Sequence, residues 1–302
     1  MSQGKGAALL PFPRRHYYTC IGKPAFADSM PGEEGAATAK IGNATVNVTH
    51  PSILNVVKQR QRVKQALAGV KHRIGVYSAK GGVGKTTIAV NLAFALKDMG
   101  YRVGLLDADI DCPNLHLFLG IRQAGEPEYP LKPLEKDGVK VISTAMFVDE
   151  AKRPIIWRGP MVAKMLGEFL EATDWGELDY LILDCSPGTS DSNLSIMQLL
   201  EMDGFVIVTT PQQIAAVNAV RSGLMARRLG VPIIGVVENM SGGTPTGANV
   251  VAGALRCEVL GTVKADKKFD EFSDSGRVAV AEDAEIKEEF ISIAKRLVNG
   301  GR

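Results

Sequence analysis

The ten residues SAKGGVGKTT (78–87) constrain the fold of this chain more than any other segment. A short apolar run, IGVYSA (74–79), leads into them, and the helix-forming sequence TTIAVNLAFALKDMG (86–100) follows. Closely spaced glycines let successive backbone N–H groups face one phosphate, and the next helix adds the positive end of its dipole. This order of strand, glycine-rich loop and helix predicts a phosphate-binding loop. Its predicted contacts are Gly81, Gly82, Val83, Gly84, Lys85, Thr86 and Thr87.

The loop contains two lysines, which the general pattern does not require. Lys85 is placed to reach the β- and γ-phosphate oxygens, and the hydroxyl of Thr86 can ligate Mg²⁺. The general pattern is Gly, four residues and then Gly-Lys-Ser/Thr, whereas this chain has Ala79 at the first glycine position. Lys80 has no evident task within its own loop, so its role has to be sought outside it.

Apolar runs of strand length alternate with helical segments from Ile74 onward. We expect strands at 74–79, 103–109, 139–144, 178–186, 204–210, 231–239 and 258–263, and helices at 52–68, 86–100, 160–172, 192–201, 212–228, 248–256 and 283–298. The strands are apolar almost throughout, which is typical of strands covered on both faces. Repeated βα units of this kind predict an α/β fold with a doubly wound, mainly parallel sheet. Such sheets bind ligands at the carboxyl ends of their strands.

Acidic residues follow two of the predicted strands. Asp184 ends the apolar run YLIL and is placed to hold Mg²⁺ through water. Asp107, Asp109 and Asp111 alternate after the strand VGLL, and one of them could orient or deprotonate an attacking water. Which of the three does so stays open, because acids at strand ends are also commonly just solvated.

Charge is distributed unevenly along the chain. Residues 1–73 contain 11 Lys/Arg and 3 Asp/Glu, whereas the remainder contains 24 and 30. A basic N-terminal arm could contact nucleic acid or an anionic surface, and a solvated tail is the simpler interpretation. We divide the chain into a basic, irregular extension (1–50), a lead-in helix and linker (51–73) and a P-loop domain (74–302).

The cysteines indicate a reducing environment. Cys20, Cys112, Cys185 and Cys257 are far apart in the sequence and form neither CxxC pairs nor a disulfide framework. No apolar run reaches the roughly 18 residues of a membrane span. We therefore expect a cytoplasmic protein. Membrane attachment through the predicted last helix (283–298) is disfavoured, because its glutamates would oppose an anionic surface.

The segment KGGVGKTT resembles the deviant Walker A loop of the family that includes MinD, ParA, ArsA and nitrogenase iron protein. Members of that family form nucleotide-sandwich dimers in which the first loop lysine reaches the partner's phosphates. The resemblance implies a homodimer closed by ATP. In it, Lys85 would serve its own nucleotide and Lys80 that of the other subunit.

A closer resemblance is to the Mrp/Nbp35/ApbC branch, the iron–sulfur cluster carrier ATPases. It rests on LLDADIDCPNLHLFLG (105–120), IIWRGPM (155–161), DWGELDYLILD (174–184) with SPGTSD (186–191), and VTTPQQ (208–213) followed by GVVENMS (235–241). These segments run in family order over about residues 74–264.

The resemblance implies particular roles for matching residues. Asp109 would be the switch I acid that positions the hydrolytic water, and Asp184 would begin the Walker B and switch II segment that ends at Asp191. Gly188 would sense the γ-phosphate, and Asn239 would read the adenine ring. ATP is favoured over GTP because a guanine-reading NKxD pattern is absent. Trp157, Arg158 and Gly159 resemble a surface element whose chemistry is not assigned, and an Arg beside a Trp could equally be a packed cation–π pair.

One departure from the branch concerns its cargo. After GVVENMS the branch normally has a CPxC pair, and two such pairs would bridge a [4Fe–4S] cluster across the dimer. This chain instead reads GGTPTGANVVAGAL (242–255), without cysteine. Cys112 and Cys185, in the two switch segments, could approach a dimer axis and offer thiols for a cluster. Lone cysteines more often fill small apolar spaces.

Two functions are therefore expected. The first is a Mg-ATP-binding and hydrolysing dimeric switch related to iron–sulfur cluster carriers, with Lys80, Lys85 and Asp109 as catalytic residues and Thr86 and Asp184 at the metal. The alternative is a MinD/ParA-like positioning or regulatory ATPase that acts on a protein, DNA or membrane partner.

Overall fold

The computed structural model describes residues 37–41, 44–48, 51–110, 112–121, 130–146, 159–188 and 190–300. The chain divides into two compact units, residues 1–50 and 51–302, and each is described by itself. In the first unit, β1 (Ala37–Ile41) pairs antiparallel with β2 (Ala44–Val48). This part of the chain was expected to be irregular, but both segments contain β-branched residues, which favour strands.

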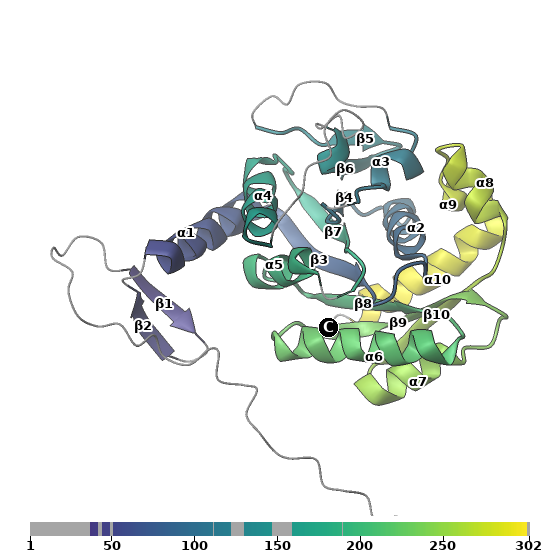
Figure 1. The fold of residues 1–302 in the computed structure, drawn as a ribbon. Helices are drawn as coiled ribbons and strands as arrows, with labels where there is room; N and C mark the ends of the chain where they lie inside the picture. The colour runs from purple at the N-terminus through teal and green to yellow at the C-terminus, as the bar shows by residue number, and fades with distance from the viewer. Residues whose placement is uncertain are drawn as a thin grey trace, which may run out of the picture. The chain divides into compact units, whose positions relative to one another are not determined.

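A mainly parallel sheet forms the centre of the second unit (Figure 1). Within the described residues its strands are β3 (Val70–Tyr77), β4 (Val103–Asp107), β5 (Leu134–Lys136), β6 (Val139–Ile142), β7 (Leu178–Asp184), β8 (Gly204–Thr209), β9 (Ile233–Ser241) and β10 (Glu258–Lys264). They lie in the order β10-β9-β8-β3-β7-β4-β6-β5. All neighbours are parallel except β5 and β6. The predicted doubly wound, mainly parallel α/β fold is confirmed.

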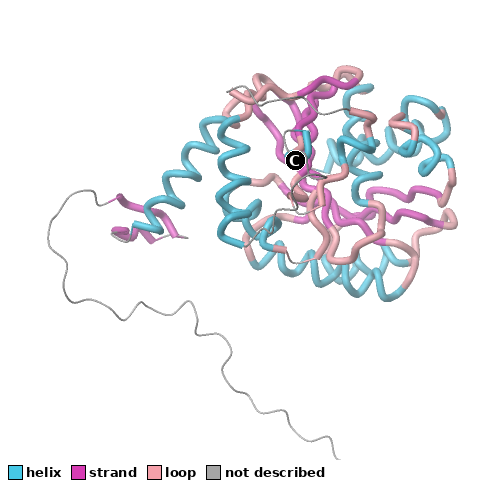
Figure 2. The backbone as a smooth tube through the Cα atoms, turned by 45° about the horizontal axis from the view of Figure 1, so that its top comes forward, coloured by secondary structure: helices cyan, strands magenta, loops and turns pink. Residues whose placement is uncertain are grey.

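Helices cover both faces of this sheet (Figure 2). One face packs against α2 (Lys85–Asp98) and α10 (Ala284–Gly300), with the short helices α3 (Leu115–Phe118), α8 (Lys268–Asp274) and α9 (Ala279–Glu282) nearby. The other face carries α1 (Pro51–Ala66), α4 (Gly159–Ala172), α5 (Asp191–Leu199), α6 (Gln213–Arg228) and α7 (Gly247–Leu255). None of the helices in the described parts of the chain combines the length and apolar character needed to cross a bilayer.

The apolar core consists of two clusters, one on each face of the sheet. Leu92 of α2 and Phe290 of α10 belong to one cluster, and Leu67, Leu166 and Ile196 belong to the other. Full burial of one such side chain contributes roughly 1.5–3 kcal/mol. Burial on both faces therefore holds the strands in place and brings their carboxyl ends together at one edge.

The sequence analysis did not predict the start of β3 or the shortest strand and helices, because these do not show up as long apolar or periodic runs. β3 begins at Val70, four residues before the predicted start, because Val70, His72 and Arg73 pair with β7 although two of them are charged or polar. β5 is a three-residue antiparallel edge strand, which is too short to leave a periodic pattern. The short helices α3, α8 and α9 were missed for the same reason.

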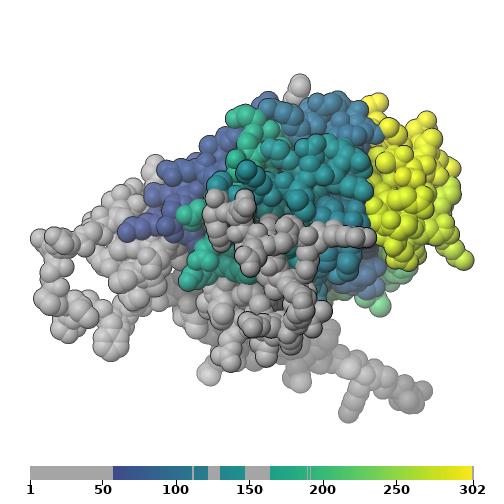
Figure 3. Space-filling model, turned by 90° about the horizontal axis from the view of Figure 1, so that it is seen from above, coloured from purple at the N-terminus to yellow at the C-terminus, as the bar shows by residue number. Residues whose placement is uncertain are grey.

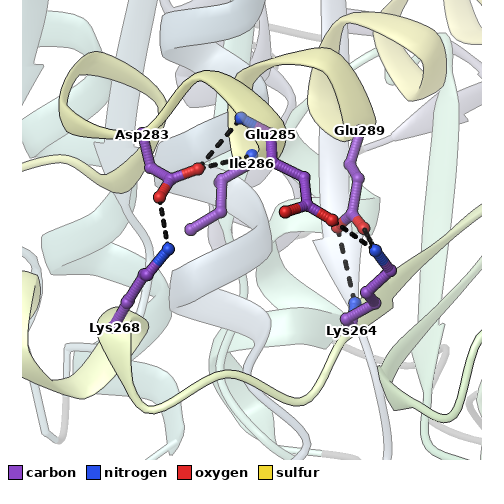
Figure 4. Close-up of polar contacts among 6 residues, drawn as sticks. All are labelled: Lys264, Lys268, Asp283, Glu285, Ile286 and Glu289. Atoms are coloured by element: carbon purple, nitrogen blue, oxygen red, sulfur yellow. Dashed lines mark hydrogen bonds and ion pairs between the residues drawn. The ribbon is translucent and has the colours of Figure 1, made fainter.

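Asp283 fixes the start of α10 (Figure 4). Its Oδ1 accepts hydrogen bonds from the backbone N–H groups of Glu285 (2.9 Å) and Ile286 (3.1 Å), and its Oδ2 pairs with the Lys268 ammonium at 2.6 Å. Lys264, in β10, pairs with Glu285. Such exposed ion pairs contribute little. The cap and the buried apolar face of α10 therefore do most to seat this helix.

Two glycines allow the backbone of the C-terminal segment to contact the backbone of the segment that follows β4. Gly120 lies after α3 and Gly276 after α8, with φ of +62° and +67°. A Cβ on Gly276 would lie 2.5 Å from the Cα of Gly120, so the two backbones meet directly. In the view from above, the yellow C-terminal residues adjoin the teal part of the surface accordingly (Figure 3).

Candidate nucleotide-binding site

The predicted phosphate loop connects β3 to α2. Gly82 and Gly84 have φ of +75° and +82°, in the left-handed region that favours glycine. A Cβ on Gly84 would also lie 2.1 Å from the amide nitrogen of Asn239, so a larger residue would have to displace that side chain. The first turn of α2 contains no acidic residue. Its N-terminus can therefore receive a phosphate anion without opposing charge from the helix itself.

The two loop lysines differ in their surroundings. Lys85 is buried, and burial lowers its pKa while the charges of Asp184 and Asp109 act in the opposite direction. Lys80 is half-buried, and no hydrogen bond or ion pair to another described residue engages its ammonium. The structure thus places Lys85 inside the site and leaves Lys80 available for a charge supplied from elsewhere.

Asp184 and Thr86 form the centre of the site. The Thr86 hydroxyl donates a 2.6 Å hydrogen bond to Oδ2 of Asp184, while Oδ1 of Asp184 is buried and has no hydrogen-bond partner. Burial raises the pKa of Asp184 to about 6, although Thr86 and the nearby Lys85 lower it. An unpartnered buried carboxylate oxygen beside a hydroxyl is a donor set that suits Mg²⁺, which prefers oxygen ligands and keeps several waters.

Asp107 has a structural role at the end of β4. Its Oδ1 accepts from the N–H of Asp109 (3.1 Å), and its Oδ2 accepts from the N–H of Leu115 (3.1 Å) and the hydroxyl of Ser143 (3.0 Å). Burial raises its pKa to about 8, and Asp184, which lies opposite it in the strand register, adds to this shift. A carboxyl that is 1% exposed and bonded to three donors is not placed to reach an attacking water.

Asp109 is more accessible than Asp107. Its Oδ1 accepts from the hydroxyl of Ser186 (3.1 Å), which follows β7, and from the N–H of Cys112 (3.3 Å). Its charge also influences the pKa of both Lys85 and Asp184. The structure therefore brings Asp109 next to the predicted metal and phosphate positions. The third candidate acid, Asp111, lies outside the described residues.

Gly188 lies against the phosphate loop. Its N–H donates to the backbone oxygen of Ser78 (3.2 Å), and its own oxygen accepts from the hydroxyl of Tyr77 (2.9 Å) and the amide of Asn193 (2.9 Å). Asn193 also donates to the oxygen of Ser186 (2.8 Å). Sequence reasoning missed Tyr77 and Asn193, because one lies within an apolar run and the other within a helix.

The end of β9 closes the other side of the loop. The Asn239 amide donates to the backbone oxygen of Val83 (2.9 Å), so in this structure it contacts the phosphate loop itself. Its reading of adenine stays a prediction. Glu238, which is fully buried, accepts hydrogen bonds from the N–H groups of Thr246 (2.8 Å) and Ala248 (2.9 Å) and from the Ser241 hydroxyl (2.8 Å). Its carboxylate therefore organises the turn 242–246, a role that sequence reasoning missed.

The three cysteines within the described residues do not gather at this site. Cys112 is exposed, but Cys185 is 2% exposed and lies in the core against Gly75, where burial raises the pKa of its thiol. Cys185 is therefore not placed to offer a thiolate at the surface, contrary to the expectation that it could approach a dimer axis. In the described parts of the chain no three His, Cys, Asp or Glu side chains come together as a metal site.

Two further predicted elements lie at the edge of the described residues. Trp157 and Arg158 lie outside them, and Gly159 is the first residue of α4. Asp191, expected to end switch II, is the first residue of α5.

Comparison with known proteins agrees with this geometry. Residues 69–298 match the model of the ParA family described as NUBPL iron-transfer P-loop NTPase. The chain belongs to this family. The iron-sulfur cluster carrier protein of Methanocaldococcus jannaschii is 41% identical over 259 residues, which cover 80% of this chain and 89% of that protein. The iron-sulfur cluster transfer protein NUBPL of Dictyostelium discoideum is 40% identical over 236 residues, 73% of each chain.

Solved structures place this P-loop NTPase among the same relatives. The nucleotide-binding protein of Archaeoglobus fulgidus, solved in complex with ADP, has a TM-score of 0.64 and 32% identity and covers 76% of this chain and 96% of its own. The septum site-determining protein MinD of Pyrococcus horikoshii, complexed with Mg-ADP, has a TM-score of 0.59 at 22% identity, covering 75% and 96%, and shows the fold alone. The resemblance drawn from the sequence is confirmed.

Proposed function

We propose that this P-loop NTPase binds Mg-ATP and hydrolyses it as a switch that closes a homodimer. The observation that carries the proposal is the Thr86–Asp184 hydrogen bond of 2.6 Å, which leaves the second oxygen of Asp184 without a partner beside the buried Lys85. Thr86 and Asp184 would hold Mg²⁺, Asp184 through water, and the metal would neutralise charge on the phosphates. Lys85 would contact the β- and γ-phosphates of the same nucleotide.

The remaining parts of the site would make the switch sensitive to the γ-phosphate. Asp109 would position the attacking water, and Gly188 would exchange its hydrogen bond to Ser78 for one to the γ-phosphate. Lys80 would reach the phosphates bound by the other subunit. ATP and ADP would then differ in how strongly they favour the closed dimer, which is what a nucleotide switch requires.

The role of Lys80 gives a direct test of the dimer. We expect Lys80→Ala to weaken the ATP-dependent dimer by more than about tenfold, because a cross-subunit ion pair is lost. Nucleotide binding by the monomer should change little, since Lys85 is intact. Sedimentation velocity with ATP and with ADP measures the first effect, and titration with a fluorescent ADP analogue measures the second.

Lys295→Ala, which removes an exposed lysine on α10, is the matched control. A Lys80→Ala protein that dimerises with ATP as well as the control does would refute the cross-subunit role. If neither protein binds nucleotide at all, the proposed function itself fails.

The chain lacks the cysteines that a cluster carrier would be expected to use for its cargo. A [4Fe–4S] cluster takes four thiolates, and the turn 242–246 contains no cysteine. Cys185 is buried, and the pKa of the Cys257 thiol is raised by burial. We infer that the chain alone does not retain a stoichiometric cluster, and that its switch acts on a macromolecular partner, as in the second function expected from the sequence.

Anaerobic reconstitution with iron and sulfide tests this inference. We expect iron and sulfide far below one [4Fe–4S] cluster per dimer after desalting, with ATP binding retained. About four irons per dimer would contradict it. Cys112→Ser and Cys20→Ser would then show which thiols hold the cluster, with the buried Cys185→Ser as the control.

A further inference from the structure

Helix α6 buries its small residues and exposes several of its large apolar residues. Its buried face consists of small residues: Ala215, Ala216, Ala219, Ser222, Gly223 and Ala226. A Cβ on Gly223 would lie 2.3 Å from the side chain of Leu255, so α6 lies very close to α7 (Figure 1). Surface helices normally turn their large apolar residues toward the core. Here the fully buried residues are all small, and the larger Val220 and Met225 are only partly buried against the core.

Three large apolar residues of α6 point toward solvent instead. The exposed fractions are 72% for Ile214, 44% for Val217 and 52% for Leu224. Together with the exposed Arg221 and Arg228 they follow the spacing i, i+3, i+7, i+10 and i+14. This is the spacing of the positions that face a partner helix in a coiled coil. We call these five residues the α6 stripe.

The charge around the α6 stripe has one sign. Between Asp203 and Glu258 the sequence contains a single acidic residue, Glu238, and it is fully buried. The exposed charged residues of α6, α7 and their ends are Arg221, Arg227, Arg228 and Arg256. A partner that lies along the α6 stripe would therefore meet apolar side chains and guanidinium groups but no exposed carboxylate from this segment. Arginine favours carboxylate partners in such interfaces.

We propose that the α6 stripe docks an acidic amphipathic helix of a partner protein. The partner's apolar residues would pack on Ile214, Val217 and Leu224, and its carboxylates would pair with Arg221 and Arg228. α6 has 16 residues, which is about 24 Å of helix and enough for two heptads. The proposal goes beyond the nucleotide switch, because none of these residues belongs to the nucleotide site.

A synthetic helix tests the proposal on the full-length protein. The probe is a fluorescein-labelled peptide of roughly three heptads with Leu at the two core positions and Glu beside them. We expect saturable binding measured by fluorescence anisotropy, weakened by salt. A peptide with Lys in place of Glu should not bind. The double variant Val217→Gln/Leu224→Gln should weaken binding by about tenfold or more, and Arg221→Glu/Arg228→Glu should weaken it similarly.

Controls separate this surface from the rest of the molecule. Leu117→Gln removes an apolar side chain that is 63% exposed elsewhere on the protein, and Lys295→Glu reverses a charge on α10. Both should leave peptide binding unchanged. All of these variants should hydrolyse ATP at the wild-type rate, so that loss of peptide binding and loss of the nucleotide switch remain distinguishable.

Three results would overturn the proposal. The first is no saturable binding of the acidic peptide, or equal binding of the Lys peptide. The second is self-association of the protein that the α6 stripe variants abolish in the absence of peptide, which would make a second copy the occupant. The third is sedimentation with phosphatidylglycerol vesicles that the same variants abolish, which would make the surface a membrane contact.

Discussion

Replacing Asp109 with Ala is expected to slow ATP hydrolysis by roughly 100-fold or more, the range seen when a positioned acid or base is removed. Asp109 is more accessible than Asp107, lies 3.1 Å from the Ser186 hydroxyl and is close enough to influence the pKa values of Lys85 and Asp184. Asp107 cannot take over, because its oxygens are buried and bonded to three donors. Nucleotide affinity should change little, so the protein should accumulate as the ATP-bound dimer.

Single-turnover hydrolysis and sedimentation with ATP measure the two halves of this prediction. Ser186→Ala is the matched control, because it removes the hydrogen bond to Asp109 but keeps the carboxylate. It should reduce the rate much less than Asp109→Ala does. If the turnover of the Asp109→Ala protein is unchanged, another acid must position the attacking water, and Asp111 is the first to examine.

Replacing Asp184 with Asn should make the ligand-free protein more stable and at the same time remove its stabilisation by Mg-ATP. Burial raises the pKa of Asp184 to about 6, compared with roughly 3.9 in an unfolded chain. The folded protein therefore holds its proton more tightly than the unfolded protein does. Stability from this group is present below about pH 4 and is lost as the pH rises toward about 6. The side-chain amide of the Asp184→Asn protein carries no charge at any of these pH values, so the variant avoids that loss.

Thermal unfolding without metal or nucleotide is the measurement. At about pH 8 the Asp184→Asn protein should have a Tm higher than wild type by roughly 5 °C, and the difference should shrink toward about pH 4. Mg-ATP should raise the Tm of wild type but not that of the variant, because the variant lacks the carboxylate that would hold Mg²⁺ through water. A variant that is less stable than wild type at the higher pH, or that gains as much from Mg-ATP, would contradict the assignment of Asp184.

The parts of the site that could be predicted from the sequence are those determined locally. Glycines, Lys85 and Thr86 follow one another in a single turn between a strand and a helix, so their order alone predicts where a phosphate binds. The register of the sheet then brings Asp184 to Thr86 from 98 positions away, and the apolar run before Asp184 was sufficient to place it.

The parts that could not be predicted depend on which way a side chain points in the folded sheet. Cys185 follows Asp184 directly and faces the core, whereas the sequence allowed it a place at the surface. Asp107 and Asp109 differ by only two positions, and only the bonds to Leu115 and Ser143 separate their roles. The exposure of Val217 and Leu224 could not be predicted either, because the sequence pattern of a helix does not say which of its faces meets the core.

The contact between Gly188 and Ser78 has a consequence for how this protein responds to its nucleotide. The N–H of Gly188 already donates to Ser78, 3.2 Å away, and Gly188 has φ of +75°, which few other residues tolerate. If Gly188 senses the γ-phosphate as proposed, the phosphate oxygen must displace a carbonyl that already occupies the same donor. Binding is then a competition between two acceptors for one N–H, and the net free energy of such an exchange is small. A small difference keeps both positions populated and makes the change readily reversible, so that the loss of one phosphate is enough to return the segment to Ser78.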